Sequence, residues 1–146
     1  MAISIRKVTL WRTQVQHRPG ALAELLEPLA AAGADLQTVM GYRLPGQKDR
    51  AVIEVAPIGT RKAAQAARSA GLAPGGAPTL LVLGDNRPGL ANRIARALAE
   101  SGVNIAFLVA QVVGRRYSAV FGFESEADLD KASDRIRAAV TARPRR

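Results

Sequence analysis

The chain carries an internal repeat, which restricts the possible folds because both copies are expected to form the same structure. Residues 18–36 align with residues 87–105, and six of the 19 aligned positions are identical. The identical pairs are Arg18/Arg87, Pro19/Pro88, Gly20/Gly89, Leu29/Leu98, Ala30/Ala99 and Gly33/Gly102. Proline suits the first helical position, the next glycine lets the backbone approach a neighbour closely, and a later glycine suits a helix end. We therefore predict two copies of one folding unit, at residues 1–73 and 74–146.

Both copies show the same order of predicted elements, namely a strand, a helix, two strands and a second helix. In the first copy these are residues 8–15, 21–32, 34–42, 51–56 and 60–70. In the second copy they are residues 79–84, 89–101, 103–113, 117–123 and a last helix capped by Ser125. Pro28 lies inside the first helix, where it is expected to cost about 3 kcal/mol or to kink the helix. This order predicts an α+β fold in which each antiparallel sheet carries both helices on one face.

Neither copy shows an obvious fourth strand to close its sheet. In the first copy this strand would have to lie in residues 72–78 or run on into residues 79–84, and the second copy ends before one could form. An unpaired sheet edge tends to pair with another edge, either between the two units or between two chains. We therefore predict a homodimer.

Composition excludes several classes of protein. The chain has no cysteine, which excludes a disulfide framework and a thiolate metal site, and no apolar run approaches the length of a membrane span. We predict a cytoplasmic protein with no membrane partner, no cofactor and no bound metal. The net charge of +9 is spread over the two halves rather than gathered in a stripe, and this favours a solubilising role over nucleic-acid binding.

The turn that leads into the second copy's first helix has the chemistry of an anion site. A strand that enters a helix through Asn-Arg-Pro-Gly directs free backbone N–H groups out of the helix start, where a carboxylate or phosphate can bind. Asn86 precedes this start, Asn104 opens the strand after the same helix, and we expect both at one end of neighbouring strands. Their amides could accept from an ammonium group and donate to a carboxylate, which favours a free amino acid or a related small carboxylate. Asparagine at such positions is equally consistent with capping and turn formation alone.

The stretches Asp85–Leu90 and Ala99–Ile105 resemble the signature of the ACT domain, a small regulatory module that binds amino acids. The second copy is especially similar to the serine-sensing ACT domain of phosphoglycerate dehydrogenase, in which two asparagines at the positions of Asn86 and Asn104 contact the ligand. The resemblance covers essentially the whole chain as two units without an attached catalytic domain. It implies ferredoxin-like βαββα units with a fourth strand, sheets joined side by side, effector sites at the junctions, and an unidentified regulated enzyme.

The candidate ligand-binding residues follow from the turn and from this resemblance. In the second copy the backbone N–H groups of Gly89 and Leu90 are expected to hold the carboxylate, and Asp85 is a charge partner for the ammonium group. The full set comprises Asp85, Asn86, Arg87, Gly89, Leu90, Asn104 and Ile105, with His17, Gly20 and Asp35 as their counterparts in the first copy. Because Asp35 would repel a carboxylate, we expect the first site to be the weaker one. His17 is either a solvated turn residue or a source of pH sensitivity.

Three other functions compete with amino-acid sensing. An enzyme is not favoured, because no nucleophile, base and orienting group are apparent beyond a formal pairing of His17 with Asp35. Residues 116–123 resemble an RNA-recognition strand, but its base-stacking positions are Ser118 and Val120, which have no ring. The third alternative is an ACT protein that has lost ligand binding and only pairs with a protein partner.

Overall fold

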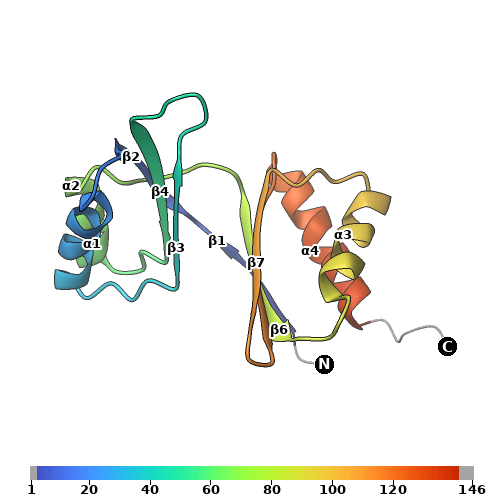
Figure 1. Ribbon diagram of the computed structural model, residues 1–146. Coiled ribbons are helices and arrows are strands. Elements are labelled where there is room, and N and C mark those ends of the chain that lie inside the picture. Colours follow the sequence, from blue (N-terminus) through green and yellow to red (C-terminus); the bar gives the residue numbers. More distant parts are fainter. Residues whose placement is uncertain (1–2, 142–146) are drawn as a thin grey trace. The chain divides into compact units, whose positions relative to one another are not determined.

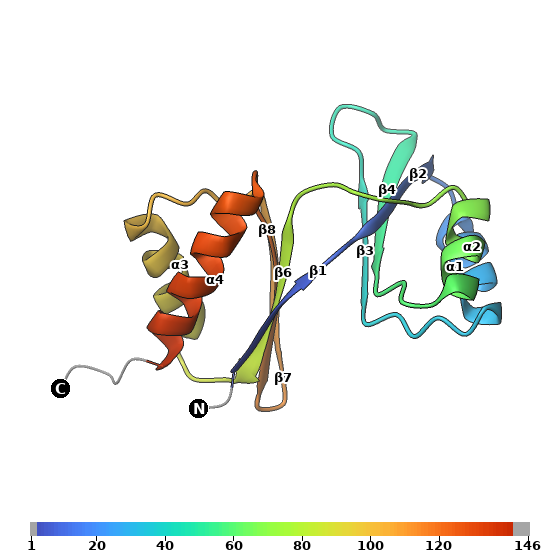
Figure 2. The ribbon, with the colours of Figure 1, turned by 180° about the vertical axis from the view of Figure 1, so that it is seen from behind.

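The computed structural model describes residues 3–141 and contains two α+β units (Figure 1). The N-terminal unit consists of Thr9–Gly76, and the C-terminal unit combines residues 77–141 with strand β1 (Ile3–Val8). Each unit has one four-stranded antiparallel sheet and two helices. Figures 1 and 2 show both helices of a unit on one face of its sheet. The predicted fold class of two ferredoxin-like units is therefore confirmed.

The N-terminal unit follows the predicted order of elements. Its elements are β2 (Trp11–Gln16), α1 (Ala21–Ala31), β3 (Thr38–Arg43), β4 (Arg50–Ala56), α2 (Arg61–Ser69) and β5 (Ala73–Pro74), and the strand order is β3-β4-β2-β5. The core between sheet and helices is formed by Trp11, Leu25, Leu29, Ile53, Val55, Ala67 and Leu72. The short strand β5 closes this sheet, and it lies within the stretch predicted to hold a closing strand.

The C-terminal unit repeats this arrangement. Its remaining elements are β6 (Thr79–Asp85), α3 (Leu90–Glu100), β7 (Phe107–Val113), β8 (Arg116–Gly122) and α4 (Glu126–Thr141), and the strand order is β1-β6-β8-β7. The predicted apolar faces of both helices are buried, and they consist of Leu90, Ile94, Leu98, Leu129, Ala132, Ile136 and Val140. Phe121 and Phe123 also lie in this core, as expected for strand residues that do not bind bases.

The strand predicted at residues 8–15 is β2, and the residues before it form an additional strand, β1, in the other sheet. β1 pairs antiparallel with β6, with Ile5 opposite Val82, whereas β2 pairs with β4 in the other sheet. Ile3 and Ile5 pack against the C-terminal core, and Lys7 forms an ion pair with Asp130 of α4 at 2.9 Å. β1 is thus the closing strand that was not apparent in the second copy, so the unit boundaries differ from the expected 1–73 and 74–146.

Local signals fix the ends of several helices as predicted. The Ala63 N–H donates to Thr60 Oγ1 at 3.1 Å at the start of α2, and the Asp128 N–H donates to Ser125 Oγ at 3.1 Å at the start of α4. Helix α1 continues past Pro28 to Ala31, and Gly33 follows with a φ of 79°. Among residues 3–141, no helix combines the length and apolar character needed to cross a membrane.

Candidate functional site

The Pro-Gly step before each helix forms a tight turn rather than the first helical residues. In the C-terminal unit the Leu90 N–H donates to the Arg87 carbonyl at 3.1 Å, and Gly89 has φ 84° and ψ 3°. Proline followed by a glycine with these angles is typical of a type II turn. Gly20 in the N-terminal unit has φ 88° and ψ −13°, and the Ala21 N–H closes the same turn at 3.3 Å. Proline therefore lies in the turn and not at the first helical position, because the helices begin two residues later.

The glycine of this turn is needed for its backbone angles and not for a close approach. A side chain at Gly89 would meet no atom within 4 Å among the described residues, so the space above it is open. Its positive φ nevertheless strains any residue with a Cβ atom. Both copies therefore retain the glycine for a conformational reason.

The start of α3 presents backbone donors, but Leu90 is not one of them. The Leu90 N–H is already used in the turn, and the Arg93 N–H donates to the Gly89 carbonyl at 3.0 Å. In the described part of the chain, the N–H groups of Ala91 and Asn92 have no hydrogen-bond acceptor, and no side chain caps the helix. The assignment of the Leu90 N–H to a ligand is thus corrected, and Ala91 and Asn92 offer the free donors.

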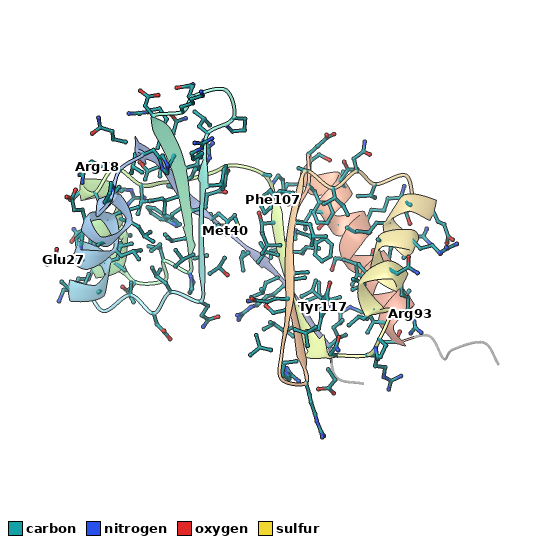
Figure 3. The ribbon with its side chains drawn as sticks, viewed as in Figure 1. Arg18, Glu27, Met40, Arg93, Phe107 and Tyr117 are labelled. Atoms are coloured by element: carbon teal, nitrogen blue, oxygen red, sulfur yellow. The ribbon has the colours of Figure 1, made fainter. Side chains whose placement is uncertain are left out.

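The structure separates Asn86 from Asn104, contrary to our expectation. Asn86 follows the end of β6, where Asp85 pairs with Arg116, whereas Asn104 precedes β7, whose first residue Phe107 pairs with Gly122 at the other end of the sheet. Figure 3 shows Phe107 at the opposite end of this unit from Arg93 in α3. Helix α3 runs between the two ends, and 11 residues at about 1.5 Å each span about 16 Å. A single free amino acid cannot bridge both asparagines of one unit.

Of the other predicted ligand-binding residues of the second copy, Asp85, Asn86 and Ile105 already make contacts within the C-terminal unit. Asp85 Oδ1 accepts from Arg116 Nη1 at 2.8 Å on the surface, so a ligand ammonium group would have to compete with Arg116 for this carboxylate. Arg87 and Asn104 are exposed, Asn86 is half-buried, and its N–H donates to the Arg115 carbonyl at 2.8 Å. Ile105 packs against the core of the C-terminal unit, which makes it a structural residue within that unit.

The counterparts in the first copy are exposed and already partly occupied. The His17 N–H donates to the Asp49 carbonyl at 2.8 Å, and Asp35 lies beyond the far end of α1, as Asn104 does beyond α3. At the helix start, Arg18 forms a hydrogen-bonded ion pair with Glu24 of the first turn. This hydrogen bond, together with the opposite charge, lowers the pKa of Glu24 and raises that of Arg18.

Comparison with known protein families identifies the family of the C-terminal copy. Residues 78–141 match the family model described as the ACT domain. This segment is an ACT domain. The N-terminal unit repeats its element order and its turn, and a tandem arrangement of two such domains fits the two sheets.

Solved structures share this fold at low sequence identity. Protein BT0572 from Bacteroides thetaiotaomicron has a TM-score of 0.73 and 18% identity, covering 91% of this chain and 88% of that one. The ligand-free regulatory subunit of aspartate kinase from Thermus thermophilus has a TM-score of 0.62 and 15% identity, covering 94% and 95%. Aspartokinase III from E. coli, solved with aspartate and ADP, has a TM-score of 0.58 and 12% identity, covering 97% of this chain and 33% of that one. No curated protein sequence matches the chain.

The start of α3 in the C-terminal ACT domain is more cationic than the start of α1. The position aligned with Glu24 is Arg93, and the first turn of α3 has no acidic side chain. Arg87 and Arg93 therefore stand beside the free N–H groups of Ala91 and Asn92 with no carboxylate between them in that turn. Arg93 is a site residue that the sequence analysis missed, although the alignment of the two copies pairs it directly with Glu24.

A second missed residue is Tyr117, which lies in the core of the C-terminal ACT domain. It is 3% exposed and pairs across the sheet with Gly84, close to the end of β6. Its hydroxyl has no hydrogen-bond partner among the described residues, and burial raises its pKa. Figure 3 shows Tyr117 and Arg93 at the same end of this unit. The equivalent position in the sheet of the N-terminal unit is Ala51, which pairs with Val15.

Proposed function

We propose that this chain is a regulatory sensor that binds a free amino acid through the start of α3 and signals to a partner enzyme. The observation that carries the proposal is the combination of two free backbone donors, Asn86 and two arginines at this helix start. Helix N-termini favour anions because of their free N–H groups and the helix dipole, and a carboxylate meets both. The regulatory subunit of aspartate kinase, whose fold the chain shares, supports a regulatory rather than a catalytic role.

The separation of Asn86 and Asn104 implies that the site is completed by a second copy of the chain. Strand β7 is an exposed edge with four large exposed apolar residues, Leu108, Val109, Val112 and Val113, and no charged residue. Such an edge favours pairing with another strand. Antiparallel pairing of β7 with β7 of a second copy would bring the Asn104 end of one ACT domain to the Asn86 end of the other. A homodimer would thus supply Asn86 and Asn104 from different copies to one amino acid.

Calorimetry with the twenty amino acids tests this proposal. At least one should bind, and a concentration of 100 times its Kd should stabilise the protein by about 2.7 kcal/mol. Asn86→Ala and Asn104→Ala should each weaken that binding, whereas Gln65→Ala removes an exposed amide from α2 and should leave it unchanged. Equal affinity in all three variants would show that the ligand binds elsewhere.

The alternative function, pairing with a protein partner without a ligand, is supported by the ion pair between Asp85 and Arg116. This pair already occupies the carboxylate proposed to meet an ammonium group. If no amino acid binds and the dimer forms through β7, a ligand-free interaction module becomes the better description. Val109→Lys would then disrupt the dimer by placing a charge on the pairing edge.

A further inference from the structure

Among residues 3–141, Glu54 is the one charged residue that is buried, with 4% of its surface exposed. It lies in β4 opposite Arg12 of β2, and Arg12 Nε is 3.8 Å from Glu54 Oε1. This distance is too long for a hydrogen bond, so the contact is an ion pair. From β3, the Tyr42 hydroxyl donates to Glu54 Oε2 at 3.2 Å. Burial and then the charge of Glu54 raise the pKa of Tyr42, which keeps this hydroxyl a donor at neutral pH.

The C-terminal unit has an apolar pair at the equivalent position. The alignment of the two copies, extended to β2, places Leu81 at the position of Arg12, and Leu81 pairs with Val120 of β8. Leu81 and Val120 are 6% and 7% exposed. A buried ion pair is often no more stabilising than such an apolar pair, because both charges lose their contact with water. The fold therefore does not require the ion pair, and this points to a role other than stability.

The ion pair lies against the segment that leaves the N-terminal unit. A Cβ atom at Gly76 would be 3.6 Å from Glu54 Oε1 and 3.9 Å from Arg12 Cδ, so the Gly76 backbone packs on both side chains. The N–H of the preceding Gly75 donates to the Leu10 carbonyl at 3.2 Å. All of these residues belong to the N-terminal unit.

These contacts hold the connection between the two units. The chain passes from one unit to the other after Val8 and again after Gly76, and the bond between Gly75 and Leu10 joins the two passages. Glycine has more backbone freedom than any other residue, and here two glycines follow each other. The connection therefore depends on its contacts for a fixed conformation.

We propose that the Arg12–Glu54 ion pair is a latch that holds Gly75 and Gly76 in one conformation and so limits the motion of the connection between the units. The Arg12 side chain is 37% exposed, whereas that of Glu54 is 6% exposed. A competing anion can thus reach Arg12 from solvent and draw it away from Glu54, which releases the connection. The latch does not depend on the proposed site at α3 or on a second copy of the chain.

The test gives the N-terminal unit the apolar pair of the C-terminal unit. Arg12→Leu/Glu54→Val should leave the melting temperature unchanged or raise it, because no buried charge remains unpaired. In the same variant, the backbone ¹⁵N order parameters of Gly75 and Gly76 should fall from about 0.85 to below about 0.6. Hydrogen exchange of the Gly75 N–H should become faster by about tenfold or more, since its bond to Leu10 opens more often.

Glu54→Gln keeps the size of the side chain and removes its charge, so it should release the two glycines as well. The matched control, Arg18→Leu/Glu24→Val, removes an exposed ion pair of the same unit and should change neither the order parameters nor the exchange rate. Unchanged order and exchange in Glu54→Gln would overturn the proposal, as would an equal effect in the control. The measurement needs no ligand, so its outcome is independent of the proposed amino-acid site.

Discussion

At the start of α1, Arg18 forms an ion pair with Glu24, whereas the aligned positions at the start of α3 hold Arg87 and Arg93. The two turns share a backbone, since both place a glycine at a φ between 84° and 88° directly before the helix. The side chains around the two turns differ. One helix start is charge-balanced, and the other is cationic. The two copies have thus kept the turn that exposes the helix start, whereas the side chains around it differ.

The two sheets also differ in how they are closed. The N-terminal sheet is closed by β5, a strand of two residues that follows its own second helix. The C-terminal sheet is closed by β1, a strand of six residues from the other end of the chain. Only the C-terminal unit therefore takes its fourth strand from outside its own continuous stretch of the chain.

The largest expected effect comes from Leu29→Ala and Leu98→Ala, which make the same change at aligned core positions. Leu29 and Leu98 are 0% and 1% exposed, so each truncation should cost its own unit about 3 kcal/mol of unfolding free energy. Trp11, the single tryptophan, lies in the N-terminal core and reports on that unit alone. In urea unfolding, Leu29→Ala should shift the fluorescence transition and Leu98→Ala should shift mainly the circular dichroism. An equal shift of the fluorescence midpoint by both variants would mean that the units unfold as one.

Much of the fold could be predicted from the sequence because its signals are local. The Pro-Gly turns, the caps at Thr60 and Ser125 and the buried face of α4 each depend on residues a few positions apart. The partner of β1 could not be predicted, because Ile3 and Ile5 alternate as in any strand and nothing in them selects β6 over β4.

The candidate site was predicted less well than the fold. The anion-binding helix start was apparent in the motif, but its free donors belong to Ala91 and Asn92, the two residues that follow Leu90. Asn86 and Asn104 each adjoin a strand, but the length of α3 between them places them at opposite ends of the sheet. Arg93 and Tyr117 were not predicted as site residues. Each stands out only when it is compared with the residue at the equivalent position of the other copy.

A smaller effect is expected at Tyr117, whose buried hydroxyl has no partner where the N-terminal unit has Ala51. An unpaired buried polar group costs about 1–3 kcal/mol, so Tyr117→Phe should leave stability unchanged or raise it by about 1 kcal/mol. The matched control is Tyr42→Phe, which removes a hydrogen bond of 3.2 Å to the buried Glu54 and should destabilise the protein by about 1 kcal/mol.

The raised pKa of Tyr117 makes the free energy of unfolding decrease at high pH. Burial raises the pKa of Tyr117 above 10.0, so the folded state retains a proton that the unfolded state loses. Its contribution is fully present below pH 10 and is lost as the pH rises through the folded-state pKa. Urea unfolding from pH 8 to 11 should therefore show a smaller loss of stability for Tyr117→Phe than for the wild type. Identical pH profiles would show that burial does not raise the pKa of Tyr117 in solution.

The smallest expected effect on stability comes from exchanging the charges that distinguish the two helix starts. Glu24→Gln should lower the melting temperature slightly at pH 7, because the Arg18 pair and the helix dipole both favour the carboxylate. Since the pKa of Glu24 is lowered from 4.5, this contribution is present above pH 4.5 and is lost as the pH falls through the folded-state pKa. The difference between Glu24→Gln and the wild type should therefore vanish in acid and shrink in high salt.

The reciprocal variant, Arg93→Glu, should raise the melting temperature slightly by giving Arg87 the partner that Arg18 has. It should also weaken the binding of any carboxylate ligand at the start of α3, because a negative charge would stand beside the N–H groups of Ala91 and Asn92. Thermal unfolding at low and high salt measures the first effect, and calorimetry with the amino acid that binds measures the second. If Arg93→Glu changed neither quantity, the charge difference between the two helix starts would have no role in stability or binding.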